Sequence, residues 1–123
     1  MIRGMRGAIT IEKDEPQIIW DETVKLVQAI VAENNVQPDD IASIIISTTP
    51  DITSAFPARS VRMLEGWEYV PVMCMHEMNV ADALPLCVRV MIHVETTLSQ
   101  RDITHVYLND AVKLRPDLIT KNV

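Results

Sequence analysis

The chain has 123 residues, of which 48% are hydrophobic and only five are aromatic, so we expect one domain with an aliphatic, methionine-rich core. The net charge of −6 and the scattered basic residues argue against nucleic-acid binding, and no apolar run approaches the ~20 residues that span a bilayer. The N-terminus lacks the long apolar core of a signal peptide and the two cysteines suit free thiols, so a cytoplasmic protein is expected.

The N-terminal segment, residues 1–12, predicts a β-strand whose side chains alternate between two faces. Arg6 shares its face with the small residues Gly4 and Ala8, which leave room for a ligand to approach. Arg3 lies on the opposite face, and we expect it to be a solvated residue at a sheet edge. For Arg6, a solvated position and a binding position remain equally open.

Residues 14–35 predict a packing helix, and residues 41–49 predict a strand. Asp14 or Glu15 can cap the helix, and Pro16 suits its first turn. The strand is continuously apolar, so we expect it to be covered on both faces. The positions that fall on one helix face at helical spacing are Ile19, Thr23, Leu26, Val27 and Ile30.

A short helix is expected from Pro57 to Gly66, with the only phenylalanine of the chain, Phe56, at its start. Arg59 and Arg62 are three residues apart and share one flank of this helix. A solvated basic flank is the common outcome of such a pattern. A helix N-terminus beside two arginines also suits anion binding, so both interpretations stay open.

Two strand-like runs lie within residues 70–96, and each carries a charged residue among apolar ones. Alternation in the second run, residues 87–95, places Arg89 beside Cys87 and Met91. An arginine among apolar neighbours needs an anionic partner, because a buried unpaired charge costs several kcal/mol. Glu77 is the only acid of the first run and is the candidate partner within the protein, and a ligand carboxylate is the alternative.

The C-terminal part predicts a short strand over residues 105–109, with Tyr107 on its polar face. Residues 111–114 predict one helical turn. Residues 115–123 are expected to be a mobile tail.

Several common chemistries find little support in the side chains of the central stretch. Cys74, His76 and Cys87 make a poor zinc set, and neither a metal nor a cofactor is expected. A Cys74–Cys87 disulfide has little support in a cytoplasmic protein. A nucleophilic Cys74–His76 pair has no orienting third group. The remaining surplus of arginines, with one acid and one tyrosine, suits a small polyanion.

The ordered set of segments along nearly the whole chain resembles the monofunctional, trimeric α/β chorismate mutases of the Bacillus type, not the all-helical class. No single motif is diagnostic, but the order of the set is highly specific. The segments are IRGMRGA at 2–8, TTPD at 48–51 with FPAR at 56–59, GWEYVPVMCMHEM at 66–78, CVRVM at 87–91, HVYL at 105–108 and LRPDL at 114–118.

The resemblance implies an α+β fold with a mixed sheet, and a homotrimer that forms a pseudo-α/β barrel with sites between subunits. It implies rearrangement of chorismate to prephenate without a cofactor or covalent intermediate. Arg6 and Tyr107 would hold substrate carboxylate, Arg89 would lie beside the ether oxygen, and Glu77 would accept a hydrogen bond from the ring hydroxyl. Further substrate contacts would come from Met73, Cys74, Met75, His76, Leu114 and Arg115, and, in the neighbouring subunit, from Phe56, Ala58, Arg59 and Arg62.

Two positions and one segment depart from the family pattern. Residue 59 is arginine where lysine is expected, which keeps the charge, and residue 73 is methionine where threonine is expected, which removes a side-chain hydroxyl. The segment 81–86, ADALPL, lacks the expected glycine and lysine. The competing hypothesis is a non-catalytic trimeric module that binds a small dicarboxylate in the same arginine cleft.

Overall fold

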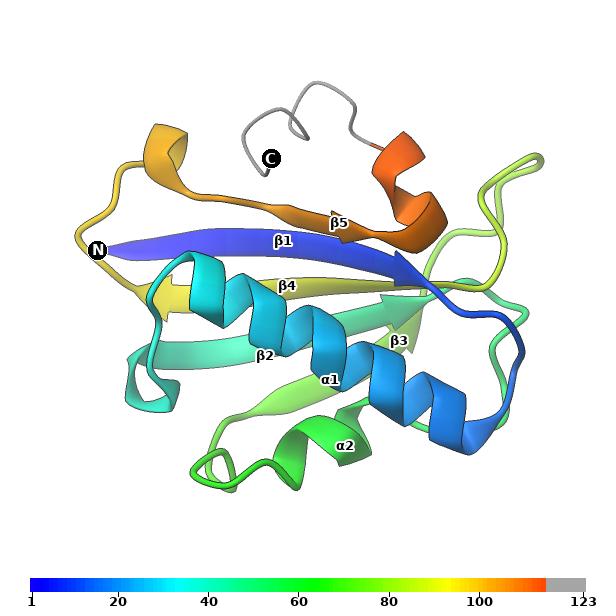
Figure 1. Ribbon diagram of the computed structural model, residues 1–123, viewed down its shortest axis with the longest axis horizontal. Coiled ribbons are helices and arrows are strands. Elements are labelled where there is room, and N and C mark those ends of the chain that lie inside the picture. The colour runs from blue at the N-terminus through cyan, green and yellow to red at the C-terminus, as the bar shows by residue number, and fades with distance from the viewer. Residues whose placement is uncertain (115–123) are drawn as a thin grey trace.

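The computed structural model describes residues 1–114, so the expected tail and Arg115 lie outside the described residues. One mixed sheet of five strands, in the order β3-β2-β4-β1-β5, forms the centre of the molecule (Figure 1). This arrangement confirms the predicted α+β fold. The strands are β1 (Ile2–Thr10), β2 (Ile41–Thr48), β3 (Val72–His76), β4 (Cys87–Glu95) and β5 (Val106–Leu108), and the helices are α1 (Pro16–Glu33) and α2 (Ala58–Arg62), with 3₁₀ turns at Pro38–Asp40, Gln100–Asp102 and Asn109–Lys113.

Strand β4 lies at the centre of the sheet and pairs antiparallel with both β1 and β2. Strand β5 adds to the free edge of β1 in parallel, and β3 adds to β2 in parallel. The alternation predicted for β4 is confirmed, because Val88, Val90, Ile92 and Val94 are buried in the core while Arg89 on the other face is half-buried.

Helix α1 crosses one face of the sheet, as Figure 1 shows, and all five positions predicted for one of its faces are buried. Gly7 lets this helix and strand β5 come close to β1. A Cβ atom at Gly7 would lie 2.7 Å from the carbonyl oxygen of Val106 and 2.9 Å from a methyl carbon of Leu26. A larger residue here would therefore push apart both the sheet and the helix layer.

Helix α1 begins at Pro16 as expected, but the predicted side-chain cap is wrong. Glu15 occupies the N-cap position without a capping hydrogen bond. Asp14 instead accepts hydrogen bonds from the backbone N–H groups of Thr53 and Ser54 and from the Thr53 hydroxyl, at 3.0–3.1 Å. Desolvation would raise the pKa of Asp14, but these hydrogen bonds outweigh it and leave the pKa lowered. The carboxylate thus fastens the loop before α2.

Two other expectations need correction. Strand β2 is not covered on both faces in this chain, since Ile44 and Ile46 are buried whereas Ile45 is only half-buried. Helix α2 ends at Arg62 and not at Gly66, which lies four residues further on in a left-handed turn with φ of +88°. Val61 faces the core as predicted.

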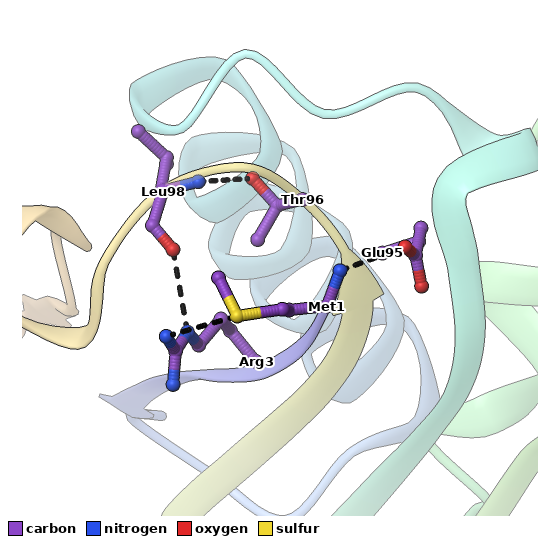
Figure 2. A network of polar contacts seen from close by, with 5 residues as sticks. All are labelled: Met1, Arg3, Glu95, Thr96 and Leu98. Atoms are coloured by element: carbon purple, nitrogen blue, oxygen red, sulfur yellow. Dashed lines mark hydrogen bonds and ion pairs between the residues drawn. The ribbon is translucent and has the colours of Figure 1, made fainter.

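Arg3 is not a solvated residue, because it is half-buried and its side chain is hydrogen-bonded, although β5 pairs with β1 only at residues 7–9 and leaves that edge open at Arg3. Its Nε donates to the carbonyl of Leu98 at 3.3 Å, and Figure 2 shows the guanidinium beside the sulfur of Met1. The terminal ammonium of Met1 pairs with Glu95 at 2.8 Å. These contacts fasten the start of β1 to the end of β4 and leave Arg3 no part in the cleft described below.

Candidate active site

Both α-helices pack on the same face of the sheet, so the opposite face, here called the helix-free face, carries no α-helix among the residues that the structure covers. Only the 3₁₀ turn at Asn109–Lys113 packs against its end, through Ala111. Gly7 meets α1 on the packed face, and Cys74, which is in register with Ile46, meets Ala58 of α2 there. The register then places two rows of side chains on the helix-free face. One row is Met75, Ser47, Arg89, Ala8 and Tyr107, and the other is Met73, Ile45, Met91 and Arg6.

A cleft of about 280 Å³ opens on this helix-free face. Its size lies near the lower end of the ~300–1,000 Å³ that is typical of small-ligand sites. It brings together residues that are far apart in sequence, on the four strands β1, β2, β4 and β5 and at the last described residue, Leu114. Its lining consists of Arg6, Gly7, Ala8, Ile45, Ser47, Arg89, Val90, Met91, Tyr107 and Leu114.

Arg89 and Glu77 form an ion pair at this cleft, as the sequence predicted. The Arg89 Nε donates to Glu77 Oε1 at 3.0 Å, and the two side chains are 40% and 16% exposed. Glu77 reaches this position because its backbone N–H donates to Thr48 at 2.9 Å and extends the β3 ladder by one step. The pair engages only Nε within residues 1–114, so the terminal nitrogens of the guanidinium can still receive an anion.

Arg6 reaches the cleft from β1, directly opposite Met91 of β4. Its backbone N–H donates to Nδ1 of His105 at 2.9 Å, which fixes the strand at this point. No carboxylate of the described chain pairs with the Arg6 guanidinium. The cleft therefore contains a second cation that is available for an anionic ligand.

Tyr107 lies on the helix-free face, as predicted, but it is largely buried. It packs in a small cluster with Ala8, Cys87 and Ala111, and Leu114 closes against them. Burial raises the pKa of the Cys87 thiol to about 11, although the nearby Arg89 guanidinium acts in the opposite direction. Cys87 is thus a neutral packing residue beside the cleft.

Cys74 and His76 share a face, as the alternation predicted, but it is the helix-packed face. The Cys74 sulfur accepts from the backbone N–H of Ala58 at 3.3 Å, and Nε2 of His76 lies 3.0 Å from the carbonyl oxygen of Ile52. Burial raises the pKa of Cys74, against smaller lowering effects from the Ala58 N–H and Arg62. The two side chains have separate partners, so the nucleophilic pair is not formed. Both cysteines are free thiols.

The α2 group of predicted residues is not in the helix-free cleft of the same chain. Phe56 is 75% exposed, and Arg59 and Arg62 are exposed as well, whereas Ala58 is buried. A second cleft of about 400 Å³ lies beside this group and is lined by residues 48, 52–57 and 74–76. One chain therefore presents two separate clefts, and Met75 lines the second of them.

The structure adds cleft residues that sequence analysis missed, chiefly Ile45, Ser47 and Met91. Ser47 gave a signal, because it is a polar residue inside an apolar strand. The complete row of cleft side chains could be identified only from the strand register. Among residues 1–114, no group of three or more histidine, cysteine or acidic side chains is placed to hold a metal ion. Over the same residues, no helix is long and apolar enough to cross a bilayer.

Comparison with known proteins gives one consistent result. The model of the family "Chorismate mutase type I" matches residues 2–118. The chain is 50% identical over 123 residues to the chorismate mutase AroH of Bacillus subtilis, covering 99% of this chain and 97% of that protein. It is 41% identical over 119 residues to the AroH protein of Thermus thermophilus, covering 96% and 97%. A solved chorismate mutase from Clostridium thermocellum superposes with a TM-score of 0.86 at 42% identity, over 89% of this chain and 96% of that chain.

Proposed function

The chain belongs to the chorismate mutase type I family, and from this premise we propose that the helix-free cleft is one half of its active site. As a chorismate mutase it is an isomerase that converts chorismate to prephenate in aromatic amino acid biosynthesis. This membership decides against the non-catalytic dicarboxylate-binding module. The proposal concerns which side chains perform the reaction and how the site is completed.

The reaction is a unimolecular Claisen-type rearrangement in which the ether C–O bond breaks while a C–C bond forms. It requires no nucleophile and no proton transfer. The rate then depends on holding the reactive conformer and on stabilising the charge that builds on the ether oxygen. Orientation alone can contribute at most ~7–11 kcal/mol in well-oriented systems.

Arg89 is the residue that stabilises the developing charge on the ether oxygen. Its half-buried guanidinium is held by Glu77 through Nε, which leaves the terminal nitrogens to donate to the breaking bond. A cation that is fixed before the reaction needs no reorganisation as the charge develops. Glu77 keeps its second carboxylate oxygen to accept the hydrogen bond of the ring hydroxyl.

Arg6 and Tyr107 bind substrate carboxylate at the other side of the cleft. Arg6 has no carboxylate partner within residues 1–114, and Tyr107 follows Arg89 and Ala8 along one row of the sheet. Local cations are needed because the net charge of −6 repels a dianionic substrate at long range. The backbone around Met73 and Cys74 lines the ring, while the Cys74 and His76 side chains face α2 and the Ile52 carbonyl. Leu114 closes the site, and the family resemblance adds Arg115, which lies outside the described residues.

A neighbouring subunit completes the site in a homotrimer by supplying Phe56, Ala58, Arg59 and Arg62. This arrangement explains why the two predicted groups of site residues occupy separate clefts of one chain. The helix-free face also leaves Met73 63% and Met75 45% exposed, and a second copy would cover them. We propose that the trimer acts in the cytoplasm, where both thiols stay reduced.

The observation that carries the proposal is the shared cleft of Arg6, Arg89 and Tyr107, with the α2 arginines outside it. The test measures conversion of chorismate to prephenate by mixed subunits. Arg89→Ala protein should be nearly inactive, and Arg62→Ala protein should convert little chorismate at concentrations well below its raised KM. Co-refolding them in equal amounts should restore about one site in four, because each site in a head-to-tail ring then draws on two different subunits.

The matched control for that mixing experiment is Arg6→Ala combined with Arg89→Ala. Both residues belong to the same half-site, so no mixture of these two proteins can contain an intact site. Recovery of activity in this control, or none in the test mixture, would contradict the shared site.

A further inference from the structure

Trp20 of α1 contacts the segment that begins α2 at two points. Its indole Nε1 donates to the carbonyl oxygen of Phe56 at 3.1 Å. The Arg59 guanidinium carbon lies 5.0 Å from the centroid of the indole ring, which is a cation–π distance. One aromatic side chain thus fixes both the backbone and the cation of this segment.

We propose that Trp20 is a positioning residue for the reaction, which holds Arg59 in the orientation that meets substrate in the neighbouring subunit's cleft. The inference rests on the proposed function, because it requires that Arg59 serves a site shared between subunits. Trp20 itself does not touch the substrate in this arrangement. It acts only through Arg59 and Phe56.

The surroundings of Arg59 support this role. The residue is exposed, and no carboxylate within residues 1–114 forms an ion pair with it. Its cation–π partner within residues 1–114 is the indole ring of Trp20, which does not neutralise the positive charge of the guanidinium. The ring therefore limits the movement of the side chain while the full positive charge stays available to an anion.

The pairing also gives a physical reason for arginine at position 59. A planar guanidinium can stack on an indole and still direct N–H groups outward at its edge. A lysine ammonium would gain from the same ring but could not offer a fork to a carboxylate. Trp20 and Arg59 therefore act as one unit, and their joint contribution to substrate binding should be lost if either residue is replaced.

The main test is a kinetic double-mutant cycle with the trimeric protein and chorismate. Trp20→Leu should raise KM about fivefold to tenfold and change kcat less than twofold, because binding is weakened while Arg89 is untouched. Trp20→Phe keeps the ring face and should raise KM by about threefold or less. Arg59→Lys and Arg59→Ala should raise KM in the parent protein but much less in the Trp20→Leu background.

Arg62→Ala is the matched control. Arg62 lies on the same short helix, and within residues 1–114 the cation–π contact with the indole is made by Arg59 and not by Arg62. Its effect on KM should add to that of Trp20→Leu. Additive effects of Trp20→Leu and Arg59→Ala, or an unchanged KM in both Trp20 variants, would overturn the positioning role alone.

A spectroscopic readout separates this proposal from the proposed function. In Trp67→Phe protein, Trp20 is the only tryptophan that remains. Arg59→Ala should change its emission, and Arg62→Ala should not. If the emission responds as expected but Arg59→Ala leaves KM unchanged, the contact is real but Arg59 does not bind substrate, which overturns the positioning role and leaves the shared site to the subunit-mixing test. If Arg59→Ala raises KM but leaves the emission unchanged, Arg59 serves the site and the Trp20 contact is refuted.

Discussion

Arg89 and Glu77 form an ion pair across a strand that separates their own elements. Arg89 lies on β4 and Glu77 directly follows β3, with β2 paired between them. Ser47 of β2 lies directly opposite Arg89 in the ladder, and Glu77 reaches Arg89 from the far side of β2. The ion pair therefore links the two strands that flank β2 and aligns the cation of the cleft before any ligand arrives.

Replacing Arg89 by citrulline, its neutral isostere, tests whether the charge acts in the transition state. We expect kcat to fall by ~10²–10³ or more while KM rises far less, because Arg6 and Tyr107 still bind the carboxylate. Arg89→Lys keeps the charge but loses the fork, so it should lose substantial activity and retain some. Steady-state kinetics with chorismate decide the matter, and a normal kcat with a raised KM would reduce Arg89 to a binding residue.

Arg6→Ala should show the opposite kinetic pattern. Removing this cation takes away binding that is present in both ground state and transition state, so KM should rise at least as strongly as kcat falls. Arg3→Ala is the control on the same strand, because Arg3 points to the other face and binds Leu98. If both substitutions changed KM equally, the effect would come from β1 as a whole and not from the cleft.

The assembly can be measured directly by light scattering. We expect a mass of about three times the 13.9 kDa chain. Met75→Glu should dissociate the trimer and abolish activity, because a buried unpaired carboxylate at an interface is costly. Gln28→Glu, which adds the same charge on the exposed surface of α1, should leave the trimer intact. A wild-type monomer that is active at nanomolar concentration would contradict the shared site.

The Cys87 thiol should make the fold weaker in alkali. Its pKa in the folded protein is about 11, against an ordinary 9.0, so the folded state keeps a proton that the unfolded chain loses. The stabilisation from the buried neutral thiol is complete below pH 9. As the pH rises toward 11, the free energy of unfolding falls by about 2–3 kcal/mol in total. Urea unfolding of wild type and Cys87→Ala at several pH values should show the steeper loss in wild type. Parallel curves for the two proteins would argue against a buried neutral thiol.

The Asp14 carboxylate should stabilise the fold at neutral pH and lose this effect in acid. Its pKa is lowered in the folded protein, so its stabilisation is present above the unfolded pKa and is lost as pH falls through the folded value. Asp14→Asn should therefore unfold more easily than wild type at neutral pH, and the difference should shrink in acid. Thermal melts from neutral pH down to acid would measure this, and a constant difference would point to lost packing instead.

Local patterns predicted the elements of this fold well, because alternation and helical spacing are properties of short segments. The alternation of β4 placed Arg89 on its face, and the burial of α1 followed from its spacing. These two features depend on neighbours along the chain. Glu77 could be named as a candidate partner of Arg89, beside a ligand carboxylate, because it is the only acid in its run, but the sequence did not predict that the pair reaches across β2.

Features that depend on distant segments could not be predicted in this way. The parallel pairing of β3 with β2 decides that Met75 joins the Arg89 row while Cys74 faces α2. Asp14 looked like a helix cap but binds Thr53, which lies 39 residues away. The contact of Trp20 with Arg59 likewise needs two helices to be placed first.

The pairing of β1 with β4 and β5 has a consequence for how the protein folds. The first strand of the sheet takes both of its partners from the last third of the described residues. Until those strands are made, both edges of β1 lack hydrogen-bond partners and are open to mispairing. The central sheet can therefore close only after β4 and β5 have been synthesised, and such distant contacts favour slow folding.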